Sequence, residues 1–227
     1  MCGRITQYRT QAKYRDAAGW SNGAFAIGEI QPQYNRAPGS APIVMHRLGD
    51  GHEPATDFVH WGYRPAWAIE KKIPMAINAR VEKAMTGPYF RHMWKSGRAI
   101  CPADGWYEWT TDEDGKKLPW YIRAKVDVPL FLAALTNWKP YKKVPEGTGF
   151  VIVTAQAGGG LIDIHDRRPI VFNAADANLW LDPDLSPERA DMLARAMALG
   201  PEKFEWYRVS TNVNSTKNND ERMINPI

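Results

Sequence analysis

Apolar and polar residues alternate with a period of two along several short segments of the chain, a pattern that predicts strands. The first clear case runs from Asp57 to Tyr63, and Arg64-Pro65 ends it. Further strands are expected at 98–101, 105–110, 119–125, 129–135, 149–155 and 204–210. Asp114-Gly115 lies between two of these segments, which is typical of a hairpin turn.

Helices are indicated mainly by the residues that begin and end them. Pro88 fits a first helical turn, Asn173 fits an N-cap, and Ser186 with Pro187 fits the start of another helix. The expected helices are 8–18, 88–95, 173–181 and 187–200. The proline-rich stretch 31–42 is expected to be a loop, and the three glycines at 158–160 a turn or the start of a short helix.

Many short strands with few helices between them argue against a doubly wound parallel sheet. We therefore expect an α+β fold with a mixed or antiparallel sheet that curls into a barrel-like core, with helices outside it. Because no linker rich in proline, glycine or serine divides the chain, residues 1–227 are predicted to form a single domain.

Composition narrows the class of protein further. Two cysteines, Cys2 and Cys101, are too few for a disulfide framework, and no ligand spacing typical of a metal site is present, so neither a metal nor another cofactor is expected. No apolar run is long enough to span a membrane, and the polar N-terminal stretch is unlike a signal peptide, so a cytoplasmic location is predicted. The net charge of +4 is compatible with nucleic acid, and ten tryptophans exceed what a core of this size needs.

The chain begins Met1-Cys2-Gly3-Arg4, and a small second residue normally allows the initiator methionine to be removed. Cys2 would then carry an amine and a thiol on adjacent carbons, with pKa values of roughly 8 and about 8.5. The amine could act as a base for the thiol, as in enzymes with an N-terminal nucleophile. Alternatively, both groups could condense with an aldehyde to give a five-membered thiazolidine. A cysteine without function at this position is the third alternative.

Asn78 and Arg80 follow the apolar residues 75–77, at the end of an expected strand or the start of a loop, where period two places both on one face. An amide can donate to a developing oxyanion, and a guanidinium can bind phosphate or carboxylate. A helix cap next to a surface arginine would give the same pattern.

Glu108 stands between bulky aromatic residues in the segment Gly105-Trp106-Tyr107-Glu108-Trp109. A carboxyl group among apolar rings is desolvated, so its pKa should rise toward neutrality, as a general acid and base requires. An exposed glutamate on an edge strand is the alternative.

His165 is the strongest histidine candidate. Asp163 and Asp166 are near enough in sequence to orient its ring, and Arg167 and Arg168 add positive charge. An ordinary salt-bridged turn would also account for this segment. Elsewhere, basic and aromatic residues are interleaved, as in proteins that bind single-stranded nucleic acid.

Seven segments, in this order, resemble the SOS response-associated peptidase (SRAP) family of abasic-site processing proteins. They are residues 1–4, 34–39, 61–63, 78–82, 98–101, 105–109 and 162–169. The resemblance implies a compact α+β domain with a barrel-like core.

The resemblance also implies a role in the DNA damage response: capture of abasic sites in single-stranded DNA through a thiazolidine link to Cys2. Removal of Met1 would precede it, and a peptidase or lyase activity would accompany it. The implied active-site residues are Cys2, Asn78, Glu108 and His165. The implied DNA-binding residues are Arg4, Asn35, Pro38, Trp67, Arg80 and Arg167. A monomer that acts on single-stranded DNA is expected, associated with the nucleoid if the source is bacterial.

Two other functions remain open at this stage. An amidohydrolase of the glutamine amidotransferase type also begins Cys-Gly and needs an oxyanion hole and an arginine, which the segment 78–80 could supply. A single-strand-binding module without covalent chemistry would use the aromatic and basic residues alone.

Overall fold

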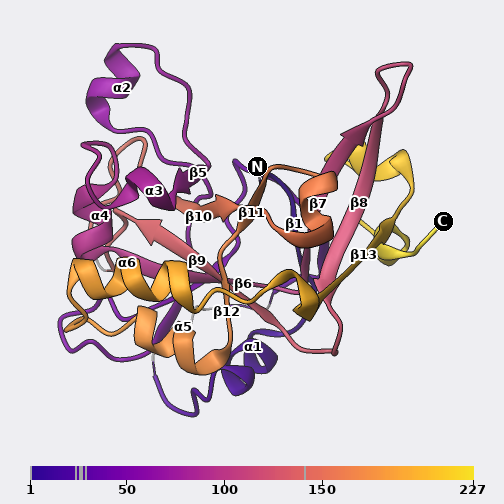
Figure 1. Cartoon of the computed structure of the whole chain (residues 1–227). Coiled ribbons are helices and arrows are strands. Elements are labelled where there is room, and N and C mark those ends of the chain that lie inside the picture. The colour runs from indigo at the N-terminus through magenta and orange to yellow at the C-terminus, as the bar shows by residue number, and fades with distance from the viewer. Residues whose placement is uncertain (1, 24, 26–27, 29, 141) are drawn as a thin grey trace.

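The computed structural model describes residues 2–23, 25, 28, 30–140 and 142–227. Its strands form two sheets. The smaller sheet has the order β13-β8-β7-β1-β2, and the larger has β11-β10-β9-β6-β3-β4, with β12 paired to β9 and β5 paired to β10. Pairing is antiparallel except between β5 and β10, which are parallel. Figure 1 shows the long β7–β8 hairpin extending away from the helices, near the C-terminus.

The elements have the following bounds. The strands are β1 Ile5–Gln7, β2 Gln33–Arg36, β3 Ile43–His46, β4 Ala55–Phe58, β5 Asn78–Arg80, β6 Arg98–Ala103, β7 Gly105–Thr111, β8 Lys117–Ala124, β9 Leu130–Thr136, β10 Phe150–Gln156, β11 Arg167–Pro169, β12 Val171–Phe172 and β13 Phe204–Arg208. The α-helices are α1 Gln11–Ala17, α2 Ala66–Glu70, α3 Val81–Ala84, α4 Arg91–Ser96, α5 Ala174–Trp180 and α6 Pro187–Ala196. Short 3-10 helices cover Gly159–Asp163, Pro201–Lys203, Thr211–Asn214 and Glu221–Ile224.

The larger sheet is buried on both faces, and alternation along its strands separates two cores. In β6, Ile100 faces one core while Ala99 and Cys101 face the other. The first core, which we call the helix-side core, packs α3, α4, α5 and α6 against the sheet. The second, the inter-sheet core, packs β1, β7, β8 and β13 of the smaller sheet against it. The fold is therefore layered: helices, larger sheet, smaller sheet.

The α+β fold with mainly antiparallel pairing is as predicted, but the barrel is not. In each sheet the first and last strands of the order are edge strands that do not pair with each other, so the described strands do not close into a barrel. The inter-sheet core explains the difference, because two open sheets that face each other bury the same apolar residues that a barrel would enclose.

The predicted boundaries are wrong in two places. The segment 57–63 was expected to be one strand, yet β4 ends at Phe58 and only isolated bridges follow at Trp61 and Tyr63. Gly62, with φ of 145°, lies between these two bridges, whose partners are different segments of the chain. The predicted loop 31–42 contains the strand β2, which pairs with β1. The expected helices at 88–95, 173–181 and 187–200 are present in shortened form as α4, α5 and α6.

Candidate active site

Cys2 lies directly before β1 and is fully buried in the inter-sheet core, beside apolar residues that include Ile5, Trp61 and Trp106. Burial raises the pKa of its thiol well above the usual range, and the nearby Glu108 carboxylate raises it further. The backbone N–H of Arg4 acts in the opposite direction by hydrogen bonding to the sulfur. The thiol is therefore held neutral until a base removes its proton.

Asn78 is brought to Cys2 by the pairing of β5 with β10, in which Asn78 lies opposite Ile152. Its side-chain Nδ2 donates a hydrogen bond of 2.9 Å to the carbonyl oxygen of Cys2. The amide thus fixes the backbone of the residue that carries the thiol. Arg80 follows on the same strand and is exposed to solvent at the start of α3.

Glu108 projects from β7, with Trp106 in the inter-sheet core and Tyr107 on the opposite side of the strand. Its side chain is only 4% exposed. Desolvation by burial raises the pKa of its carboxyl group to about 7, and the negative charge of Asp166 acts in the same direction. The rise toward neutrality is the one that the flanking aromatic residues predicted.

His165 lies between the 3-10 helix Gly159–Asp163 and β11, half-buried. Its Nδ1 accepts a 2.9 Å hydrogen bond from the backbone N–H of Arg167, which favours the tautomer with the proton on Nε2 when the ring is neutral. The Asp166 carboxylate lies 2.8 Å from the same nitrogen. Burial lowers the pKa of His165, and Asp166 partly offsets this effect. Since Asp166 acts electrostatically on both His165 and Glu108, these three side chains belong to one site.

Arg4 and Asn35, predicted to contact DNA, lie together. Arg4 donates to the Asn35 side-chain oxygen and, at 2.8 Å, to the carbonyl of Val213, and its guanidinium lies 5.6 Å from the ring centre of Trp109. Asn35 is buried and donates to the backbone oxygens of Val213, Ser215 and Asn218. Asn35 thus fixes the C-terminal segment and orients Arg4, while Arg4 itself is partly exposed.

Arg167 is nearly buried and already bonded within the protein. Its two terminal nitrogens bind both carboxylate oxygens of Glu82, at 2.7 and 2.9 Å, and one of them also donates to the Thr154 carbonyl at 2.7 Å. This contact joins α3 to β10 and β11. The sequence did not single out Glu82 as a partner of Arg167, because 84 residues separate them and no spacing pattern relates them.

Pro38 and Trp67 stand apart from these groups. Pro38 is half-buried in the turn after β2, where Gly39 donates to the Trp61 carbonyl. Trp67 is 42% exposed on α2, edge-on to Tyr89, with the Lys71 amine 5.9 Å from its ring centre. Figure 1 shows α2 projecting beyond the rest of the molecule. The structure therefore brings Cys2, Asn78, Glu108 and His165 into one site and leaves Trp67 on a projecting helix.

Two further residues belong to this region that were not predicted as catalytic or DNA-binding residues. The guanidinium of Arg4 lies over the ring of Trp109, and Trp109 Nε1 donates a 2.7 Å hydrogen bond to Asn214 Oδ1. Cys101 is buried in the same core as Cys2 and is close enough to raise its pKa. Within the described residues, no cluster of three or more histidine, cysteine, aspartate or glutamate side chains could hold a metal ion. Nor does any described helix combine the length and apolar character needed to cross a bilayer.

Known proteins of one family are similar to this chain over most of its length. Residues 1–216 match the family model described as SOS response associated peptidase (SRAP). The chain is 38% identical to the abasic site processing protein YedK of Escherichia coli, over all of both chains. It is 33% identical to the abasic site processing protein YoaM of Bacillus subtilis, over 99% of this chain and 97% of the relative. A crystal structure of a phage-related protein from Bordetella bronchiseptica matches with a TM-score of 0.78 and 36% identity, over 92% of this chain and 95% of that one.

Proposed function

Because the chain belongs to the SOS response associated peptidase family, we propose that it captures abasic sites in single-stranded DNA by a covalent link to Cys2. The observation that carries the proposal is the position of Cys2: buried, held through its carbonyl by Asn78, and next to a carboxyl group whose pKa is about 7. Removal of Met1 is part of the proposal, and Met1 itself lies outside the described residues.

The link forms in two steps from an aldehyde and an aminothiol. The amine nitrogen of Cys2 attacks the aldehyde carbon of the ring-opened sugar, and loss of one water leaves a C=N bond. The sulfur then adds to the same carbon and closes a thiazolidine. The new bonds are C–N and C–S. The aldehyde oxygen leaves as water together with the two amine protons. When the sulfur adds to the carbon, the thiol proton passes to the nitrogen and restores one N–H bond. No oxidant or other reactant is needed.

Glu108 is suited to move these protons. A group whose pKa is about 7 is present in both protonation states at neutral pH, so it can give a proton to the departing oxygen and take one from the thiol. The raised pKa of the Cys2 thiol makes such a base necessary, because little thiolate forms without one.

His165, whose ring lies next to the Asp166 carboxylate, is a second group that can carry a proton. With Nδ1 occupied by the Arg167 backbone N–H, its Nε2 is the nitrogen that can exchange a proton with the sugar or the Schiff base. An unclosed Schiff base would permit β-elimination of the strand, so a lyase side activity belongs to the same proposal.

The DNA strand is proposed to pass over Arg4, Arg80 and Trp67, each of which presents exposed surface. Phosphates are bound by the first two and a base stacks on the indole. The family resemblance assigns Arg167 the same role, and a phosphate at this position would compete with the carboxylate of Glu82 for the guanidinium. Pro38 is proposed to wedge against the strand beside Trp61.

The first test replaces the nucleophile. Cys2→Ala should form no stable adduct with an oligonucleotide that contains one abasic site, whereas the parent should gain the mass of the oligonucleotide minus one water. Cys101→Ala is the matched control, since it removes the other thiol of the same core and should still form the adduct. Intact mass spectrometry before and after incubation, with a denaturing gel, gives both results. Stable adduct formation by Cys2→Ala, equal to the parent, contradicts the thiazolidine.

The second test replaces the proton carrier. Glu108→Gln should slow adduct formation by roughly 10²–10⁴-fold, the usual contribution of general acid–base catalysis, while binding of the intact strand is kept. Rates come from gel time courses and affinity from fluorescence anisotropy. A parallel loss of rate and affinity would instead assign Glu108 a structural role.

The same reagents separate the two other functions that the sequence left open. An amidohydrolase of the glutamine amidotransferase type would release ammonia from glutamine and leave abasic DNA unmodified. A non-covalent binding module would bind intact and abasic strands equally and give no adduct. We also propose that the protein is cytoplasmic and monomeric, and that it has a peptidase activity toward Met1.

A further inference from the structure

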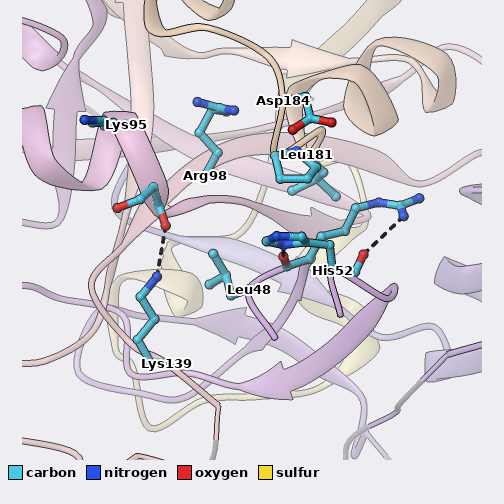
Figure 2. A pocket seen from close by; sticks show the side chains of 10 residues that line it. Leu48, His52, Lys95, Arg98, Lys139, Leu181 and Asp184 are labelled. Atoms are coloured by element: carbon cyan, nitrogen blue, oxygen red, sulfur yellow. Dashed lines mark hydrogen bonds between the residues drawn. The ribbon is translucent and has the colours of Figure 1, made fainter. Parts of the chain in front are cut away.

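A hollow of about 240 Å³ opens on the helix side of the larger sheet, lined by side chains from four separate parts of the chain. Arg47 follows β3, His52 lies in the β3–β4 loop, Lys95 is near the end of α4, Arg98 begins β6, and Lys139 follows β9. Figure 2 shows Lys95, Arg98, Lys139 and His52 arranged around this hollow, with Asp184 at one side. We call it the basic pocket.

The floor of the basic pocket is a buried, permanently charged group. Arg98 is 6% exposed and donates to the carbonyls of Trp94 and Trp180, at 3.0 and 2.9 Å. It also donates to the carbonyls of Asp182 and Leu185, at 2.8 and 2.9 Å. All four partners are neutral backbone oxygens, one in α4, one at the end of α5 and two in the turn between α5 and α6. Burial lowers the pKa of Arg98, but a guanidinium stays charged at every physiological pH.

The rim is held in place by local hydrogen bonds. Lys139 Nζ donates to the Ser96 carbonyl at 3.1 Å. His52 adopts a left-handed backbone conformation with φ of 55°, and its Nδ1 lies 3.1 Å from the Arg47 carbonyl, which fixes the ring as a donor there. A non-glycine residue in this conformation needs such support, so the loop that carries His52 is shaped by its contact with Arg47.

Positive charge is concentrated in this pocket. Its lining holds four permanent cations, Arg47, Lys95, Arg98 and Lys139. Within the described residues none of the four forms an ion pair with a carboxylate, as is also true of most other arginines and lysines there. Asp184 supplies the one negative charge of the lining. Four cations against one carboxylate leave a net positive hollow.

We propose that the basic pocket binds a phosphate group. Its four cations come from three segments that line one hollow, and a phosphate, with acceptor oxygens on all sides, can be held by several of them at once. Arg98 gives four of its five N–H groups to carbonyls, so it contributes mainly its charge, while the two lysines are the flexible donors. The volume of the pocket lies below the usual range for whole drug-sized ligands, so it suits one compact group. The phosphate belongs either to a free small molecule or to the backbone of a nucleic acid strand, and the chemistry of recognition is the same for both.

This site is distinct from the site around Cys2. Arg98 contacts Trp94 and Trp180 of the helix-side core, whereas Cys2 lies in the inter-sheet core on the other face of the larger sheet. None of the residues that line the pocket is used in the covalent chemistry. Phosphate binding is therefore expected to be unchanged in Cys2→Ala.

The test titrates inorganic phosphate into the full chain and follows backbone amide shifts by NMR, against sodium chloride of equal ionic strength. Saturable shifts are expected for the amides of Leu48, Ser96 and Arg98. In the double variant Lys95→Ala/Lys139→Ala, the dissociation constant should rise roughly tenfold or more, because two nearby charges are lost. The matched control Lys13→Ala/Lys203→Ala removes two exposed lysines elsewhere and should bind as the parent does.

A second arm identifies the source of the phosphate by titrating an oligonucleotide without an abasic site. Shifts at the same amides indicate a DNA backbone, whereas shifts with inorganic phosphate alone indicate a small phosphate compound. The thermal midpoint of each variant, measured without phosphate, separates a lost site from a misfolded one, and Lys95→Gln/Lys139→Gln replaces the alanines if that midpoint falls. Absence of saturable shifts in the parent, or equal affinity in the parent and the pocket variant, overturns the proposal.

Discussion

Burial acts on Cys2 and Glu108 in the same direction but with different consequences. It raises both pKa values, so the thiol is kept protonated while the carboxyl group is brought to about 7. Of the two, only the carboxylate can then accept a proton readily near neutral pH. By excluding water from both groups, the inter-sheet core gives each the protonation behaviour that the proposed chemistry requires.

The raised pKa of Glu108 predicts a pH dependence of stability. In the unfolded chain the carboxyl group ionises near its ordinary pKa of about 4.3. The folded state therefore binds the extra proton between about pH 4.5 and 7, and the free energy of unfolding falls as the pH rises through this window. For a rise to about 7, the loss is on the order of 3 kcal/mol by pH 8.

Glu108→Gln should remove this loss because glutamine does not titrate. Urea unfolding of the parent and the variant between pH 4.5 and 8 measures the difference, and the two curves should diverge most at the alkaline end. Parallel curves across the whole range would mean that the Glu108 carboxyl group is not desolvated.

At the scale of elements, the entry of β10 into the larger sheet depends on a glycine. Gly149 accepts a 2.9 Å hydrogen bond from Thr136 Oγ1 and its N–H donates to Asn137 Oδ1 at 3.0 Å. A Cβ atom at this position would lie 2.1 Å from the Gly62 carbonyl oxygen and 2.4 Å from that of His60. The backbone of residues 60–62 and the start of β10 can pack this closely only without a side chain. Since β10 also pairs with β5, the same contact supports the position of Asn78.

Gly149→Ala should therefore lower the free energy of unfolding by about 2–3 kcal/mol, because backbone atoms must move to admit the methyl group. Gly158→Ala is the control, since its φ of −144° is allowed for alanine and no atom lies within 4 Å of the added Cβ. That change should be neutral or stabilise by less than about 1 kcal/mol. Urea titrations of both variants compare their free energies of unfolding. Equal values would show that the backbone of residues 60–62 moves at little cost to admit the methyl group.

At the scale of the whole molecule, the two candidate sites lie on opposite sides of the larger sheet. Cys2 and Glu108 belong to the side of the smaller sheet, and Arg98 and the basic pocket to the side of the helices. A net charge of +4 is modest, so the strand binding that we propose would depend on where the cations stand rather than on their number.

Salt dependence of strand binding tests this distribution. Arg80 is exposed beside Asn78, and if it binds one phosphate, Arg80→Ala should reduce the slope of log K against log salt by about 0.7. Arg189 is exposed on α6, on the helix side, and Arg189→Ala should leave the slope unchanged. Anisotropy titrations with an intact single strand at several salt concentrations give both slopes. An unchanged slope for Arg80→Ala excludes a phosphate contact by that side chain.

The sequence by itself determined the α+β class, several strand positions and the aromatic surroundings of Glu108, because these follow from local alternation and turn residues. β7 has the predicted order of faces, with Trp106 in the inter-sheet core and Tyr107 on the other side. The family resemblance identified the segments that carry Cys2, Asn78 and His165. Local pattern did not reveal the short strands β1 and β2, since a strand of three or four residues leaves little periodicity to detect.

Only the tertiary structure decided which distant groups meet. The Asn78 bond to the Cys2 carbonyl spans 76 positions, and the Arg167 contact with Glu82 spans 85. Two open sheets in place of a barrel, and four cations from three separate segments around one hollow, are likewise products of packing. The physical reason is that alternation specifies which side of a strand is apolar, whereas the partner that covers that side is selected by the burial and hydrogen bonding of the complete chain.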